Sequence, residues 1–117
     1  MLNDVKDHFR AELGLPDELL GEFVDTFLLS FDNSAAELRA ILAAPEVDFL
    51  AVRRATHTIT GFAQTSGAAD LLEAALALNA SAHAADAAAC RDGSRAILDL
   101  HARYRAEASV DGGGANG

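Results

Sequence analysis

The sequence predicts an all-α protein, an antiparallel up-down four-helix bundle with a short N-terminal capping helix. Half of the 117 residues are apolar, but only two are proline and 6% are aromatic, which favours helices over a β-sandwich. Apolar residues also recur at intervals of three and four, the spacing of a buried helix face. A chain of this length supports one core, so we assign residues 1–107 to one domain and residues 108–117 to a flexible Gly-rich tail.

The first helix is expected over residues 3–13, with Asn3 as its N-cap and Gly14 as its stop. A long second helix opens at Pro16 and closes before Pro45, because proline is tolerated in a first turn and ends a helix elsewhere. Its predicted core positions alternate spacings of four and three: Leu20, Val24, Phe27, Phe31, Ser34, Leu38 and Ile41.

The third helix follows Asp48, its expected cap, and contains the most informative stretch of the chain. Its apolar stripe comprises Val52, Ala55, Ile59, Phe62 and Ser66. At 100° per residue, His57 points roughly 170° away from the middle of that stripe. Arg53, Gly61 and Gln64 share its side. Gly61 costs a helix interior roughly 1 kcal/mol relative to alanine, so its presence suggests a role other than stability.

The last two helices are predicted after Gly67 and from near Asp86 to about Glu107. Their expected inner positions are Leu71, Ala75, Leu78 and Ala82, then Cys90, Gly93, Ile97, Leu100 and Tyr104. We expect Cys90 to behave as a small buried hydrophobe, and His8 and His101 to lie at the surface. A single cysteine fits a reducing compartment.

The charge distribution is uneven. The net charge is −9, and residues 1–50 hold eleven acids against three bases, whereas residues 51–69 hold two arginines and no acid. An acidic protein has no general attraction for nucleic acid, but an acid-free patch around one histidine tolerates a phosphoryl group. No run approaches the ~18 apolar residues of a membrane span, and the charged N-terminus is unlike a signal peptide. We therefore expect a cytoplasmic protein without a membrane partner.

The stretch His57-Thr-Ile59-Thr-Gly61, with Gly67 ten positions after the histidine, resembles the signature of the histidine-containing phosphotransfer (HPt) family. In that family the pattern runs His-x-Leu-Lys-Gly, followed by a second glycine and a Leu-rich helix. Two positions depart from it: Thr60 stands where the family has lysine, and Ala63 where serine is frequent. The resemblance covers about residues 4–107 and implies a free-standing HPt protein with the bundle fold.

The resemblance also implies a function. His57 would accept a phosphoryl group from the aspartyl phosphate of a response-regulator receiver domain and pass it to another receiver in a two-component phosphorelay. Such a carrier is not an autonomous enzyme and binds no cofactor, since the receiver supplies the Mg²⁺. A hybrid histidine kinase is a further possible partner, and a monomer is expected. The histidines and Cys90 show no metal-ligand spacing, so no metal site is predicted.

The other site residues follow from the same resemblance. Arg53 would balance phosphoryl charge, Gly61 would leave room for the receiver, and Asn79 would take the place of a family glutamine that hydrogen-bonds the histidine. Because Thr60 carries no charge, we expect slower transfer or a more labile phosphohistidine than lysine would give.

The sequence is also consistent with two alternatives to a phosphoryl carrier. The first is an HPt-like docking module that binds a kinase or receiver without carrying phosphate, which the missing lysine favours. The second is an unrelated helical adaptor whose acidic second helix forms the interface. Replacing His57 by glutamine distinguishes the carrier from the adaptor. In a carrier the change abolishes phosphoryl acceptance and leaves binding largely intact, whereas in the adaptor it alters nothing.

Overall fold

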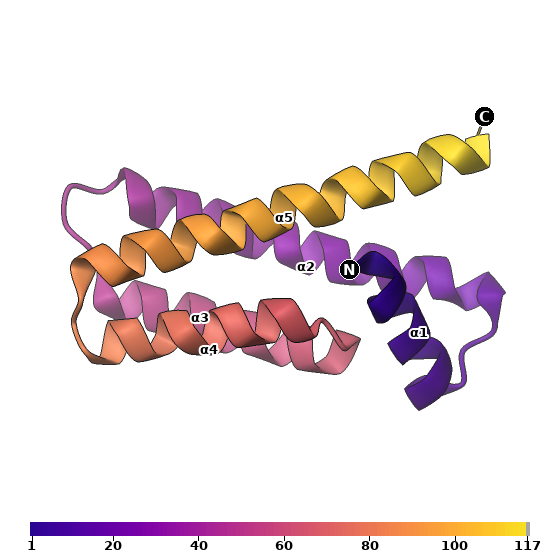
Figure 1. The fold of residues 1–117 in the computed structure, drawn as a ribbon, viewed down its shortest axis with the longest axis horizontal. Helices are drawn as coiled ribbons and strands as arrows, with labels where there is room; N and C mark the ends of the chain where they lie inside the picture. Colours follow the sequence, from indigo (N-terminus) through magenta and orange to yellow (C-terminus); the bar gives the residue numbers. More distant parts are fainter. Residues whose placement is uncertain (117) are drawn as a thin grey trace.

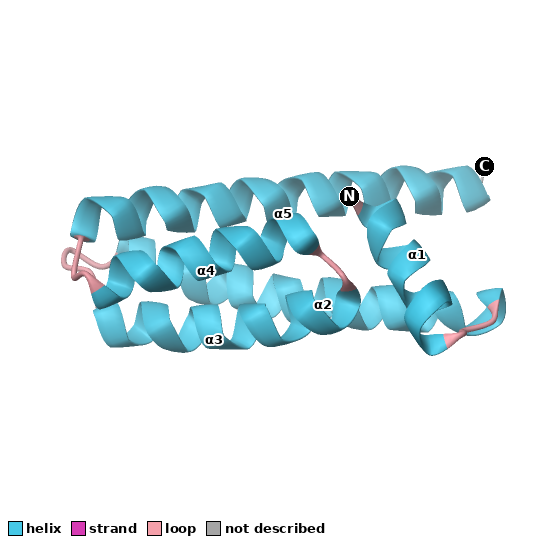
Figure 2. Cartoon of the chain, turned by 60° about the horizontal axis from the view of Figure 1, so that its bottom comes forward, coloured by secondary structure: helices cyan, strands magenta, loops and turns pink. Residues whose placement is uncertain are grey.

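The computed structural model describes residues 1–116, and the side chains of residues 1–110. Within residues 1–116 the chain is all-helical, with five helices joined by short connections and no strand (Figures 1 and 2). The helices are α1 (Leu2–Leu13), α2 (Asp17–Ala43), α3 (Phe49–Ser66), α4 (Ala69–His83) and α5 (Ala87–Asn116). The predicted all-α class is confirmed.

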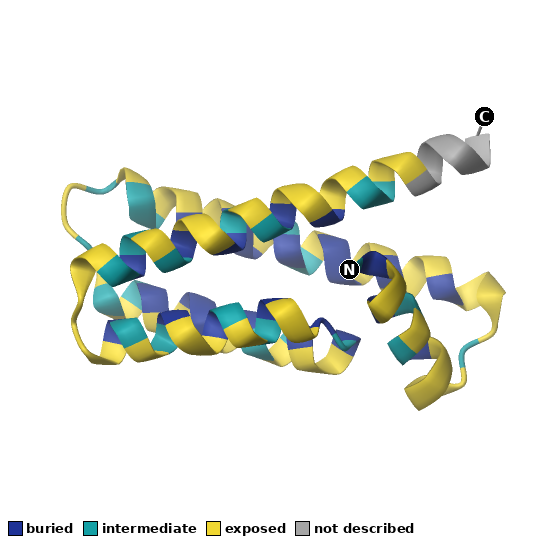
Figure 3. Ribbon diagram, in the orientation of Figure 1, coloured by how far each residue is buried: buried dark blue, intermediate teal, exposed yellow. Residues whose placement is uncertain are grey.

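The helices pack as a bundle around one apolar core. The most extensive helix pair is α3 with α4, α5 packs on α4, and α2 contacts both α3 and α5. The short α1 lies across the bundle and contacts α2, α3 and α5 (Figure 1). Buried positions face the interior of the bundle along each helix, and exposed positions face outward (Figure 3).

Most predicted helix boundaries are confirmed. α1 ends at Leu13 and is capped by Gly14, which has a left-handed backbone with φ of 61°. The carboxylate of Asp48 accepts a hydrogen bond from the Ala51 amide at 3.0 Å and so caps α3. The predicted cap Asn3 is wrong: α1 begins at Leu2, because the Leu2 amide donates to Glu107 Oε1 instead.

The predicted core faces of three helices match the observed burial. In α3 the stripe is buried except for the partly buried Phe62, and in α4 all of its predicted inner positions are buried. In α2 only Ile41 of the predicted seam is not fully buried. Buried Cys90 behaves as the expected small hydrophobe, and burial raises the pKa of its thiol.

The predicted inner face of α5 lacks two buried polar residues. Ser94 and His101 are buried, while the predicted Gly93 and Leu100 are only partly so. Polar side chains occupy these core positions because each is satisfied: Ser94 Oγ donates to the Cys90 carbonyl oxygen at 2.7 Å, and His101 Nε2 lies 2.6 Å from Asp32 Oδ1. His101 is therefore a core residue that ties α5 to α2.

The helix α5 also continues past Glu107, its predicted end, to Asn116. Ala106, Glu107 and Ala108 are helix-compatible residues with no breaker among them, and Ala108 packs against the core. The predicted mobility of residues 108–117 stays a prediction.

Gly67 connects α3 to α4 through a close contact that the sequence does not reveal. Its φ is 69°, and an added Cβ would lie 2.3 Å from His8 Cγ. His8 is therefore half-buried over this turn, not solvated as predicted. Glycine is required at position 67 for both its backbone conformation and its lack of a side chain.

Candidate functional site

His57 lies in the middle of α3 and is exposed, as the helix periodicity predicts. Its helix is fixed from the opposite side, where Val52, Ala55 and Ile59 are fully buried in the bundle core. The imidazole has no side-chain hydrogen bond or ion pair with any described residue. A neutral imidazole held in this way presents a nucleophilic nitrogen to solvent or to a partner.

His57 belongs to an open depression of about 520 Å³ between α3 and α4, which we call the basic depression. Its lining consists of Leu50, Arg53, Arg54, His57, Thr58, Asn79 and His83. The first five residues come from α3 and the last two from α4. The predicted site residues Arg53, His57 and Asn79 are thus brought together.

The basic depression contains no carboxylate, although the protein as a whole carries a net charge of −9. Neither Arg53 nor Arg54 forms an ion pair with a described side chain. The acidic residues nearest in sequence are Asp48, which precedes Leu50, and Asp86, which follows His83. Each caps a helix by accepting a hydrogen bond from a backbone amide of that helix. The positive charge of the depression therefore has no internal counter-ion.

Gly61 lies one helical turn beyond His57 and outside the basic depression. A Cβ built at this position meets no heavy atom within 4 Å, and the residue is exposed. Close packing within the protein therefore does not require glycine here, in contrast to Gly67.

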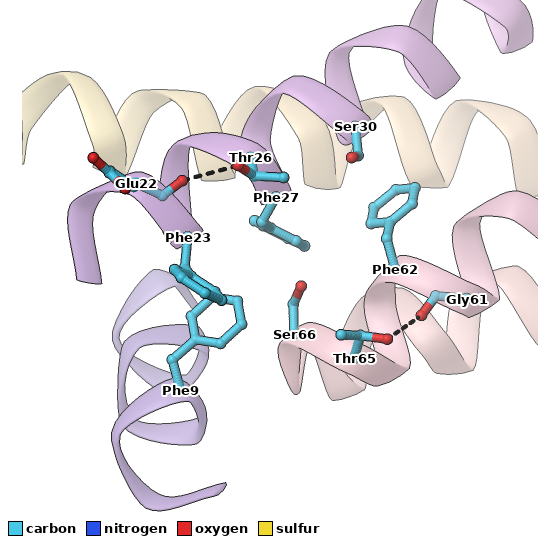
Figure 4. Close-up of a pocket in the computed structure, with 10 residues that line it drawn as sticks. All are labelled: Phe9, Glu22, Phe23, Thr26, Phe27, Ser30, Gly61, Phe62, Thr65 and Ser66. Carbon is cyan, nitrogen blue, oxygen red and sulfur yellow. Dashed lines mark hydrogen bonds between the residues drawn. The ribbon is translucent and has the colours of Figure 1, made fainter. Parts of the chain in front are cut away.

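Gly61 instead borders a second hollow of about 530 Å³, which we call the apolar cleft (Figure 4). Four aromatic rings line it: Phe9 from α1, Phe23 and Phe27 from α2, and Phe62 from α3. Figure 4 shows Phe9 and Phe23 side by side, with their ring centroids 5.5 Å apart. Phe23 is 38% exposed, which is high for so large an apolar side chain. Sequence periodicity assigns Phe27 and Phe62 to the core and does not predict the cleft.

The remaining predicted site residues are engaged elsewhere or lie apart. Asn79 Oδ1 accepts a hydrogen bond from the buried Thr56 hydroxyl at 3.1 Å rather than contacting His57. Thr60 Oγ1 donates to the backbone carbonyl oxygen of His57 at 2.9 Å, so its proton is directed to the helix and not toward the ring. Gln64 is exposed and lines neither hollow.

Arg54 and His83 complete the basic depression but are not among the site residues predicted from the sequence. His83 lies one helical turn after Asn79, so helix periodicity already places the two on the same side of α4. The missing information was the packing of α4 against α3, which brings this side of α4 next to His57.

Neither a metal-binding cluster nor a membrane-spanning helix is found among the described residues. No group of three or more His, Cys, Asp or Glu side chains in the described part of the chain is arranged to hold a metal ion. None of the described helices is both long and apolar enough to cross a membrane.

Comparisons with protein-family models, with curated proteins and with solved structures find no match.

Proposed function

We propose that this protein is an HPt-type phosphoryl carrier in a two-component phosphorelay, with His57 as the phosphorylated residue. The sequence support is the His57-to-Gly61 signature followed by Gly67. The short connections and the side-by-side packing of consecutive long helices support the finer fold of this proposal, an antiparallel up-down four-helix bundle.

The proposal rests mainly on the residues that surround His57. An exposed imidazole with no described partner shares a carboxylate-free depression with two unpaired arginines, in a protein of strongly negative net charge. Coulomb attraction between Arg53, Arg54 and a phosphoryl dianion on the ring stabilises the phosphorylated form, and no neighbouring carboxylate opposes it.

The transfer step needs little from the carrier beyond this arrangement. The lone pair of a neutral His57 ring nitrogen attacks the phosphorus of an aspartyl phosphate on the receiver domain. A nitrogen–phosphorus bond forms, the acyl oxygen–phosphorus bond breaks, and the electron pair leaves with the aspartate carboxylate. The other ring nitrogen keeps its proton. The receiver contributes its own Mg²⁺, and the reverse step delivers the phosphoryl group to the next receiver.

The apolar cleft supplies a docking surface for the receiver domain. Gly61 lines the cleft and lies one helical turn after His57. An apolar surface of the receiver that packs in the cleft is therefore close to His57. The absence of a side chain at Gly61 leaves space at the edge between the cleft and the histidine. Exposed aromatic side chains such as Phe23 are typical anchors of protein interfaces.

Phosphoryl transfer from a panel of radiolabelled, phosphorylated receiver domains tests the proposal. The wild type is expected to acquire an acid-labile, base-stable label, the chemical signature of phosphohistidine. The His57→Gln variant is expected to acquire none. Arg103→Gln serves as the matched control, because it changes an exposed α5 side chain outside the basic depression and should leave acceptance unchanged.

A docking module that carries no phosphate is the second candidate, and the geometry of Thr60 favours it. The hydroxyl at the position of the family lysine is used within the helix and offers nothing to a phosphoryl group. In that case receivers bind to wild type and His57→Gln alike, and neither protein becomes labelled.

A further inference from the structure

His83 has no evident structural task in this fold. It is exposed in the last turn of α4, and it makes no side-chain hydrogen bond, ion pair or ring contact with a described residue. It nevertheless lines the basic depression together with His57. A cationic side chain is favoured in the last turn of a helix, where the backbone carbonyl groups carry partial negative charge.

The other cationic groups of the depression, Arg53 and Arg54, both come from α3. A group bound against α3 alone would be held from one side. The lining residues contributed by α4 are Asn79 and His83, and the Asn79 oxygen already accepts a hydrogen bond from Thr56. An anion needs donors, so the amide N–H groups of Asn79 and the ring of His83 are the groups of α4 that can close the depression from the opposite helix, and His83 is the one of the two that can carry a positive charge.

A histidine suits this task in either protonation state. A neutral imidazole donates one N–H, and a protonated one donates two and adds a positive charge. The small number of cationic groups in the depression and the acidic remainder of the chain suit a single phosphoryl group and not an extended polyanion such as nucleic acid.

We infer that the basic depression is a binding site for a phosphate-class dianion held between Arg53 and Arg54 of α3 and His83 of α4. In the phosphorylated carrier, which rests on the proposed function, His83 is a positioning residue for the phosphoryl group on His57. It supplies from the neighbouring helix the donor that Thr60 does not supply from α3.

Titration with inorganic phosphate tests the anion site without any phosphoryl transfer. Ring signals of His57 and His83 are followed by NMR at constant ionic strength, with chloride as the comparison anion. Both signals are expected to shift saturably with phosphate only. His83→Gln should weaken binding about two- to fivefold, the range that an exposed charge pair gives, and His83→Lys should restore it. Arg103→Gln, an exposed α5 change outside the depression, should leave it unaltered.

The lifetime of phosphohistidine tests the positioning role. Phosphoramidate loads the ring directly: a histidine nitrogen bonds to phosphorus while the donor's own phosphorus–nitrogen bond breaks and ammonia leaves. His83→Gln is expected to shorten the lifetime about two- to fivefold, with rescue by His83→Lys and no effect of Arg103→Gln.

The two measurements separate the two claims. Saturable phosphate shifts in a protein that no donor phosphorylates would support the anion site and reject the carrier function. Equal phosphate affinity in wild type and His83→Gln, or wild-type shifts no larger than those with chloride, would overturn the inference even if His57 is phosphorylated.

Discussion

Gly61 occupies a mid-helix position where alanine would give a more stable helix. Its backbone is helical, and an alanine methyl group would meet nothing within 4 Å. Glycine in such a place loses more backbone entropy on folding than alanine does. The protein therefore carries an avoidable destabilisation one turn from His57.

Replacing Gly61 by alanine should consequently raise the free energy of unfolding by about 0.5–1 kcal/mol. Under the proposed function the same methyl group lies where the receiver approaches, and crowding a packed contact costs ~1–3 kcal/mol. We expect phosphoryl acceptance to slow by about fivefold or more. Urea unfolding and the initial rate of labelling measure the two effects.

Gly21 provides the matched control for this experiment. It lies in the interior of α2, is exposed, and also has no heavy atom within 4 Å of an added Cβ. Gly21→Ala should therefore stabilise the protein to a similar extent without slowing acceptance. Equal transfer rates for Gly61→Ala and wild type would contradict the role assigned to the open space at position 61.

The exposure of His57 could be predicted from sequence because it depends only on the period of its own helix. The surroundings of that histidine could not, because they depend on which face of α4 meets α3. His8 shows the same limit: its position over Gly67 requires α1 to cross the turn between α3 and α4, and no pattern within residues 3–13 contains that information.

At the scale of whole helices, α2 and α5 are joined at the edge of the core by hydrogen bonds between Asp32, His101 and Arg105, which we call the polar tie. Asp32 accepts hydrogen bonds from Arg105, through both carboxylate oxygens, and lies 2.6 Å from His101 Nε2. The Arg105 guanidinium, and to a smaller extent His101, lower the pKa of Asp32 to about 2, against the opposing effect of burial.

A carboxylate whose pKa is lowered on folding stabilises the native state at any pH above its unfolded value of about 4. That contribution declines as the pH falls from about 4 through about 2, where the folded-state carboxylate becomes protonated. We therefore expect the difference in unfolding free energy between wild type and Asp32→Asn to be largest above pH 5. It should shrink steadily toward pH 2.

Urea unfolding of both proteins across this pH range measures the difference, and the other acids cancel in the comparison. Glu37→Gln is a suitable control, since Glu37 is an exposed α2 carboxylate without a described hydrogen bond. A difference between wild type and Asp32→Asn that does not change with pH would show that the tie contributes no titratable stability.

A second polar link joins α5 to α4. The buried Tyr104 hydroxyl donates to Asp70 Oδ1 at 2.7 Å, and burial followed by this carboxylate raises the pKa of the phenol. The sequence correctly identified Tyr104 as an inner residue of α5. It missed Ser94 and His101, because hydrophobicity does not favour burial of polar side chains, and theirs depends on hydrogen-bond partners in the folded protein.

At the scale of the whole molecule, α3 separates two hollows of different character. The basic depression lies toward α4, and the apolar cleft lies toward α1 and α2, where the acidic Glu22 also contributes to the lining. A partner that fills the cleft and reaches His57 is thereby oriented, because reversing it would place apolar groups on the arginines. The all-helical class and core faces could be predicted from sequence, but this division of the surface required the packed helices.

This arrangement has a kinetic consequence if the protein relays phosphoryl groups. Donor and acceptor receivers would both need to contact His57, which lines the basic depression, and Gly61, which lines the apolar cleft. They would therefore compete for the same side of α3. They cannot occupy it simultaneously, so the relay follows a ping-pong order with exchange of partners between the two transfers.

An acceptor whose phosphorylatable aspartate has been replaced should act as a competitive inhibitor of loading by the donor. Raising its concentration should increase the apparent KM for the donor and leave kcat unchanged. A complex containing donor, carrier and acceptor together would contradict the shared surface. In a cell, the ratio of phosphorylated to unphosphorylated protein for each receiver would then set the direction of net phosphoryl flow, because the carrier presents the same surface to both.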